Sequence, residues 1–112
     1  MKLKLQKITG RIPQGSYQGV IIEESVSFDG KYLWMKIELK DYIEILNISI
    51  PINSVLFNQF ALCFQDDDGN VDTEDFVNTE ISFTVGDKII GGVIYSKFLT
   101  LEPIWEDEEN NN

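Results

Sequence analysis

The sequence predicts a small, mainly β domain with one helix, and three observations support this prediction. The chain has 112 residues, of which 43% are hydrophobic, which is enough for one core but leaves too little chain for two domains. Apolar and polar residues alternate from residue 32 to residue 40, as in a half-buried strand. Asp29-Gly30 stands between two apolar runs and is a strong signal for a β-hairpin.

Three strands are predicted in the first half of the chain. The first spans residues 17–26, and a hairpin over 28–31 joins it to the second strand, 32–40. The third strand spans 42–50 and ends at Pro51, which has no amide hydrogen to give to a sheet. Its apolar residues change parity along the strand, which predicts either a bulge or burial on both faces.

A helix is predicted after the third strand. Ser54 is a favourable N-cap, and the apolar residues of 55–64 recur near helical spacing. Cys63 falls in this apolar segment and is expected to pack in the core. An acidic surface loop is predicted over 66–70, and either Asp72 or Thr73 is expected to cap one further helical turn.

Two strands follow the helical region. The fourth strand is predicted over 80–85 with a turn at 86–88, and the fifth over 94–101. Gly91-Gly92 forms either a bulge or the flexible part of the turn before the fifth strand.

Three strands, one helix and two strands are the element order of the five-stranded OB barrel. The helix between the third and fourth strands favours this barrel because it closes one end of it, and an SH3-like barrel is the main alternative. We therefore expect a five-stranded OB-fold domain over residues 1–105, followed by an acidic, disordered tail over 106–112.

Several kinds of chemistry are excluded by residues that the chain lacks. It has no histidine, which removes histidine-based catalytic triads and histidine-ligated metals. Its single cysteine, Cys63, rules out an internal disulfide and zinc sites with paired cysteines. We expect no enzymatic activity, no metal and no cofactor. Because no signal peptide is recognised and no apolar run approaches the roughly 20 residues of a membrane span, we expect a cytoplasmic protein without membrane contact.

The charge is unevenly distributed along the chain. The net charge is −10, yet residues 1–40 carry +3 and residues 41–112 carry −13. The acidic residues form one cluster over 66–75 and a second over 106–109. Such runs either form a solvated surface or imitate a polyanion that competes for a basic groove.

The predicted solvent face of the strand over 32–40 combines aromatic and basic side chains, which suits a nucleic acid. Every base has a flat face that stacks on an aromatic ring, and lysine meets the phosphates. OB folds present such residues on their second and third strands. The candidate nucleic-acid-binding residues are Tyr32, Trp34, Lys36 and Lys40 on this face, with Phe28, Lys31, Tyr42 and Lys88 framing the groove. The alternative is that Tyr32 and Trp34 pack under the N-terminal segment or in a dimer interface.

Four segments carry a resemblance to a known family. They are Ile12-Pro13-Gln14-Gly15-Ser16-Tyr17, Gly30-Lys31-Tyr32-Leu33-Trp34-Met35-Lys36, Asn53-Ser54-Val55-Leu56-Phe57-Asn58 and Asp68-Gly69-Asn70-Val71-Asp72. With these segments the chain resembles the short single-stranded-DNA-binding proteins encoded by bacteriophages of Gram-positive bacteria. The resemblance implies an OB fold, sequence-tolerant binding of single-stranded DNA, and a role in phage DNA replication or recombination within the bacterial host cell.

Partners other than DNA are expected at the acidic tail. Bacterial single-strand binders end in an acidic tail with an apolar tip that docks replication or recombination proteins, whereas here Glu106, Asp107, Glu108 and Glu109 are followed by three asparagines. The residue pattern leaves RNA open as a ligand and is compatible with a homodimer through the first or last strand. The alternative function is an acidic protein that imitates DNA and inhibits a host nucleic-acid-binding protein.

Overall fold

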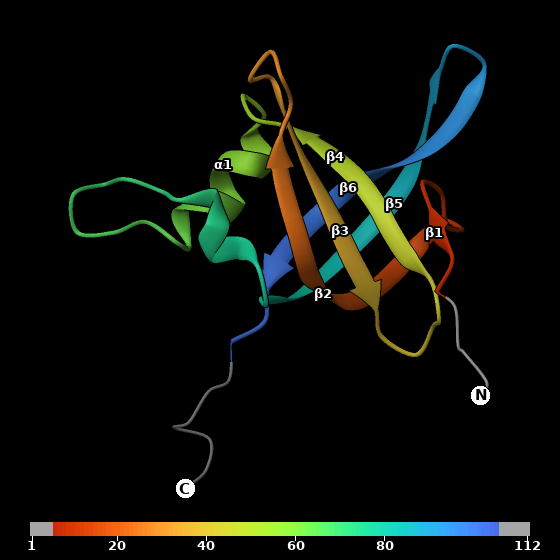
Figure 1. Ribbon diagram of the computed structural model, residues 1–112, viewed down its shortest axis with the longest axis horizontal. Helices are drawn as coiled ribbons and strands as arrows, with labels where there is room; N and C mark the ends of the chain where they lie inside the picture. Colours follow the sequence, from red (N-terminus) through yellow and green to blue (C-terminus); the bar gives the residue numbers. More distant parts are fainter. Residues whose placement is uncertain (1–5, 106–112) are drawn as a thin grey trace, which may run out of the picture.

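A computed structural model describes residues 6–105, and over this range the protein is mainly β with one α-helix, as predicted. Its six strands form one sheet in the order β1-β4-β3-β2-β5-β6 (Figure 1). The elements are β1 (Ile8–Thr9), β2 (Gly15–Val26), β3 (Tyr32–Leu39), β4 (Ile45–Pro51), α1 (Val55–Leu62), the 3₁₀ turn η1 (Thr73–Phe76), β5 (Glu80–Ile90) and β6 (Val93–Pro103). The sequence predicted five strands, and the additional strand in the structure is β1. The expected tail over 106–112 lies outside the described residues.

Strands β2 and β3 form the predicted hairpin, although β2 begins at Gly15 and not at residue 17. At the turn the Ser27 hydroxyl donates to the Asp29 carboxylate at 2.6 Å, and Gly30 has a φ of 73°, which glycine adopts without strain. The predicted alternation in β3 is confirmed, because every second side chain lies in the core. These buried residues are Leu33, Met35, Ile37 and Leu39.

Strand β4 is buried on both faces, which is one of the two outcomes predicted for it. Its pairing with β3 runs without a register shift. One face enters the core through Leu46, Ile48 and Ile50. The other face is covered because β1 pairs with the start of β4 and the hairpin of β5 and β6 approaches Ser49. The strand begins at Ile45 and not at residue 42, since the chain turns at Asp41, whose φ is 68°.

Helix α1 begins where predicted and ends earlier, at Leu62. The Ser54 Oγ accepts a hydrogen bond from the Phe57 amide at 3.1 Å, as expected of an N-cap. The prediction for Cys63 is wrong: this residue is the C-cap and is exposed, because the helix faces the core with Phe57 and Phe60. No helix within residues 6–105 is long and apolar enough to cross a membrane.

The turn η1 anchors the acidic segment that follows α1. Of its two predicted caps, Asp72 is the one observed, since the Asp72 carboxylate accepts a hydrogen bond from the Glu74 amide at 3.0 Å. Phe76 has 0% exposure. Its ring contacts those of Phe57, Phe60 and Phe64, with ring centroids between 4.8 and 6.3 Å apart. This aromatic cluster holds one end of the acidic loop against the core.

Strands β5 and β6 form a long hairpin, and here the predicted turn at 86–88 is wrong. The two strands stay paired as far as Ile90 and Val93, and the chain reverses at Gly91-Gly92, whose φ angles are 57° and 80°. Two consecutive left-handed residues are typical of a type I′ hairpin turn. Because β5 leaves β2 after residue 85, residues 86–97 extend beyond the rest of the sheet, and we call them the arm (Figure 1).

Strand β1 and the three residues after it, which we call the N-terminal strap, connect β4 to the arm. The strap pairs with the start of β4, and its Gly10 carbonyl accepts a hydrogen bond from the Ser96 amide at 2.9 Å. The Ser96 hydroxyl accepts another from the Ile12 amide at 2.9 Å. Arg11 forms a salt bridge with Asp87, at 3.1 Å, where the arm begins. Strand β4 and the base of the arm are thereby held together.

The Asp87 carboxylate is the charged anchor of the strap. Its Oδ2 accepts hydrogen bonds from Arg11 at 3.1 Å and from Gln14 at 3.3 Å. The hydrogen bond from Arg11 has the largest effect on the pKa of this carboxyl and lowers it from its ordinary value. Its Oδ1 is buried and has no partner within the described part of the chain.

Replacing Phe76 by alanine removes a buried ring and leaves a cavity beside the rings of Phe57, Phe60 and Phe64. We expect the free energy of unfolding to fall by about 3 to 5 kcal/mol, the usual cost of this change in a core. Urea denaturation followed by circular dichroism measures it. The matched control is Phe28→Ala at the exposed hairpin turn, which should cost less than about 0.5 kcal/mol. A similar, small effect for both variants would contradict the role given to Phe76.

The substitution Asp87→Asn tests the anchor of the strap. Because its folded-state pKa is lowered, Asp87 stabilises the protein above the ordinary carboxyl pKa, and this contribution is lost as the pH falls through the folded-state value. We expect the stability difference between the unaltered protein and Asp87→Asn to shrink below about pH 4. Denaturation between pH 7 and pH 2.5 measures it, with the exposed loop change Asp67→Asn as control. A difference that does not vary with pH would overturn the assignment.

Candidate nucleic-acid interface

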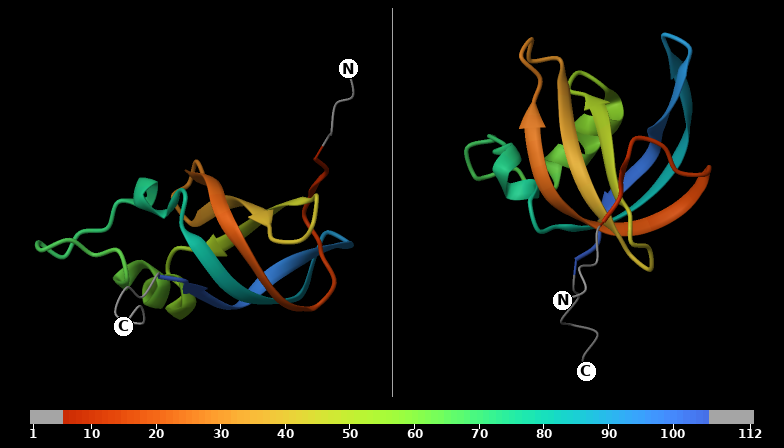
Figure 2. Two further views of the ribbon diagram at one scale, coloured as in Figure 1. Left: turned by 90° about the horizontal axis from the view of Figure 1, so that it is seen from below. Right: turned by 45° about the vertical axis from the view of Figure 1, so that its right-hand side comes forward.

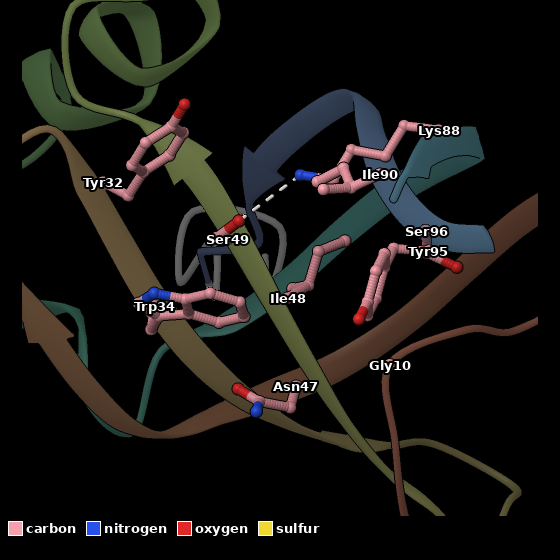
Figure 3. A pocket seen from close by; sticks show the side chains of 10 residues that line it. All are labelled: Gly10, Tyr32, Trp34, Asn47, Ile48, Ser49, Lys88, Ile90, Tyr95 and Ser96. Carbon is pink, nitrogen blue, oxygen red and sulfur yellow. Dashed lines mark hydrogen bonds between the residues drawn. The ribbon is translucent and has the colours of Figure 1, made fainter. Parts of the chain in front are cut away.

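A groove lies between the outer face of β3 and β4 and the arm (Figure 3). Its volume is about 370 Å³, which is in the range of ligand-binding sites. It is lined by Gly10, Tyr32, Trp34, Asn47, Ile48, Ser49, Lys88, Ile90, Tyr95 and Ser96. These residues come from the strap, from β3 and β4, and from both strands of the arm, so the groove depends on the tertiary fold.

The wall on the β3 side is formed by Tyr32 and Trp34. Alternation along the strand turns both side chains outward, and each residue is 41% exposed to solvent. Trp34 pairs across the sheet with Ser49, so its ring stands beside the floor of the groove. The predicted solvent facing of these two residues is confirmed, and the strap does not bury them.

The opposite wall is formed by the arm, through Lys88, Ile90 and Tyr95. Lys88 and Tyr95 are cross-strand neighbours, which places both on one face of the hairpin. Tyr95 and Trp34 lie on opposite sides of the groove in Figure 3. Tyr95 was missed from the sequence because its facing depends on where the chain turns. A two-residue turn at Gly91-Gly92 would have fixed that register.

The floor of the groove comes from β4 and combines polar Asn47 and Ser49 with apolar Ile48. Ser49 is 8% exposed, and its Oγ lies 3.5 Å from the Nζ of Lys88. Asn47 stands on the same face of the strand, two residues earlier, and lies below Trp34 in Figure 3. The strap closes one end at Gly10, where a Cβ would be 3.3 Å from the Tyr95 ring. Glycine therefore allows the strap to pass close to this ring.

Three of the predicted residues, Lys36, Phe28 and Lys31, do not line the groove. Lys36 borders a smaller hollow beside Trp34 and forms a salt bridge with Glu23 at 3.1 Å. Phe28 and Lys31 are exposed at the turn between β2 and β3. This turn and the tip of the arm project on the same side of the sheet (Figure 2).

Lys40 and Tyr42 lie at the turn between β3 and β4, at the other end of the sheet (Figure 1). They line a different hollow, where the rings of Tyr42 and Tyr17 are 5.8 Å apart. Burial has the largest part in raising the pKa of the Tyr17 phenol, and the nearby Tyr42 adds to it. The structure therefore does not bring these two predicted residues into the groove.

Tyr32, Trp34 and Lys88 are the predicted residues that the structure does bring together. Lys88 is the only charged residue among those that line the groove. The acidic cluster over 66–75 covers the loop between α1 and η1 and the first residues of η1, a segment that projects from the other side of the molecule (Figure 1). This cluster therefore lies away from the groove.

The arrangement suits flat aromatic groups that carry an anion nearby. Rings on both walls offer faces for stacking, and the single ammonium offers one charged donor. In the part of the chain that the structure describes, no group of three histidine, cysteine, aspartate or glutamate side chains is placed to hold a metal ion.

The function of the groove has to be inferred from its own geometry. No family model, curated protein or solved structure matches the chain. The rings of the two walls, the single ammonium and the polar residues of the floor are therefore the observations that point to a ligand.

Proposed function

We propose that the chain binds single-stranded DNA in this groove, without strong preference for base sequence. The observation that carries the proposal is the convergence of Tyr32, Trp34 and Tyr95 on a groove whose only charged lining residue is Lys88. Bases of a single strand are free to stack on such rings, whereas those of a duplex are stacked on one another. Stacking contributes about 1 to 3 kcal/mol per base whatever the base, which gives affinity without sequence readout.

We propose that the sheet is a variant of the OB-type barrel, and the order of its elements supports this. Strands β2 to β6 supply five strands, α1 lies between β4 and β5, and the strap joins β4 to β6. OB folds bind oligonucleotides on their second and third strands and on two of their hairpin loops. The corresponding parts here are β3, β4, the turn between β2 and β3, and the tip of the arm.

Lysines outside the groove are proposed to contact the strand more weakly. Lys31 and Phe28 are exposed on the side of the sheet to which the arm projects (Figure 2), so they are placed to meet a strand that leaves the groove. Lys36 stands beside Trp34, but its salt bridge with Glu23 competes with any phosphate. The electrostatic part of binding is therefore small.

The proposed biological role follows the resemblance to phage single-strand binders. It is the protection of single-stranded DNA during phage replication or recombination in the cytoplasm of a bacterial host. RNA is a second ligand that the same stacking and phosphate contacts would accept. Recruitment of replication or recombination proteins through Glu106 to Glu109 belongs to the proposal, and these residues lie outside the described range.

A second candidate function is inhibition of a host nucleic-acid-binding protein by imitation of DNA. One observation favours it: the carboxylates of the acidic cluster, in the loop after α1 and in η1, are all exposed. They are Asp66, Asp67, Asp68, Asp72, Glu74 and Asp75. This candidate requires binding to a basic protein that is lost when Asp66, Asp67 and Asp68 become asparagine, together with no binding to oligonucleotides.

The substitution Trp34→Ala tests the proposed function. It removes one stacking surface, so we expect the affinity for single-stranded DNA to fall by about 1 to 3 kcal/mol, roughly 5- to 150-fold in Kd. The measurement is fluorescence anisotropy of a labelled thymidine oligonucleotide of about 20 bases at low salt. Unlabelled duplex of the same length should fail to compete.

The other tryptophan provides the matched control. Trp105 lies on the far side of the molecule, in a hollow between α1 and β6, with its ring 5.4 Å from that of Phe64. Trp105→Ala should therefore change the Kd by less than about twofold, and circular dichroism confirms that both variants fold. Equal losses in both variants, or no binding by the unaltered protein, would overturn the proposal.

A comparison of two tyrosines tests whether the groove, and not the whole outer surface, binds the strand. Tyr95→Ala removes a ring from the arm wall and should weaken binding by about 1 to 3 kcal/mol. Tyr42→Ala removes an exposed ring of the same kind at the turn between β3 and β4 and should have an effect of less than about twofold. The same anisotropy titration measures both. The reverse order of effects would place the strand elsewhere on the sheet.

A further inference from the structure

Lys88 and Ser49 form a polar pair within the groove that the stacking role of the rings does not explain. The Lys88 Nζ lies 3.5 Å from the Ser49 Oγ, which is the long limit of a hydrogen bond (Figure 3). Ser49 is 8% exposed, and this contact is the one hydrogen bond that its side chain makes within residues 6–105. The hydroxyl proton is therefore left to be donated to a ligand.

The Lys88 ammonium has no anionic partner in the described part of the chain. The salt bridges there join Arg11 to Asp87 and Lys36 to Glu23. Lys88 is half-buried in a groove with mostly uncharged walls, so water only partly compensates its charge. Such a group favours a ligand that brings a negative charge.

The polar pair lies between the two walls that carry the rings. In Figure 3, Trp34 lies on one side of the groove, Tyr95 lies on the other, and the contact between Lys88 and Ser49 crosses the space that separates the walls. Two successive bases that stack on these two rings are joined by a sugar and a phosphate diester. That link has to pass over the polar pair.

We propose that Lys88 and Ser49 form a subsite for the phosphate diester that links two stacked nucleotides. The Lys88 Nζ and the Ser49 hydroxyl both donate to its non-bridging oxygens. A carbonyl oxygen of a base is the other acceptor that fits two donors. It is neutral and leaves the ammonium uncompensated, so the charge favours the phosphate. This inference rests on the proposed function and specifies that Lys88 and Ser49 contact the phosphate backbone of the DNA.

Two oligonucleotide backbones distinguish these acceptors. The probes are a labelled thymidine 15-mer with ordinary phosphodiesters and the same 15-mer with uncharged methylphosphonate links, each titrated by anisotropy. We expect Lys88→Met to weaken binding of the charged probe about tenfold and that of the neutral probe less than twofold. The slope of log K against log salt should fall in magnitude by about 0.7, the value for one phosphate contact on a single strand.

Lys97→Met is the matched control, because it removes the same charge from the arm at an exposed position that does not line the groove. It should leave both affinities within about twofold. Ser49→Ala should show the same dependence on the backbone as Lys88→Met, with a smaller loss.

The outcomes separate the subsite from the proposed function. An equal loss on both backbones would assign Lys88 to a base carbonyl and overturn the phosphate subsite. Binding by the unaltered protein that Lys88→Met leaves unchanged would also overturn the subsite alone. Failure of the unaltered protein to bind the charged probe would overturn the proposed function itself.

Discussion

The groove depends on the hydrogen bonds that join the N-terminal strap to the arm. A two-stranded hairpin that has left its sheet is only marginally stable in water. The arm alone therefore does not fix the position of Tyr95 relative to Trp34. Ser96 supplies the fixed point, because its amide donates to Gly10 and its hydroxyl accepts from Ile12. The salt bridge between Arg11 and Asp87 adds a charged contact at the same place. The separation of the two walls, and hence the width of the groove, follows from these contacts.

The parts of the fold that were predictable are those that local pattern determines. Alternation in β3 identified both its buried face and the outward rings of Tyr32 and Trp34, because neighbouring side chains on a strand must point to opposite faces. The turn at 86–88 was wrong because Gly86 serves packing and not reversal: a Cβ there would be 3.3 Å from the side chain of Leu99. That contact, like the pairing of β1 with β4, joins residues whose proximity no local pattern records. Tyr95 was not selected because its facing depends on the position of the turn, which Gly91-Gly92 would have indicated.

The site illustrates the same division between local and long-range information. The residue types on β3 indicated a stacking surface, but the opposite wall and the floor come from segments that meet only after folding. Lys40 and Tyr42 have the composition expected of a binding surface and lie at the wrong end of the sheet. Composition along one strand therefore led to a proposal for the kind of ligand, and it did not predict the extent of the groove.

The net charge of the protein bears on the proposed selectivity for single-stranded DNA. Non-specific binding to duplex DNA comes almost entirely from phosphate contacts, and a chain with a net charge of −10 and one lysine in its groove offers few of them. Exposed charges act over about 8 Å at physiological salt, and the acidic loop beyond α1 projects from the other side of the molecule (Figure 1). The proposal therefore expects this loop to repel a bound strand only weakly. Aromatic rings offer stacking contacts to unstacked bases, whereas the shortage of lysines leaves a duplex with few phosphate contacts. An acidic chain with an aromatic groove is therefore better suited to discriminate single strands from duplex than a basic chain with the same rings.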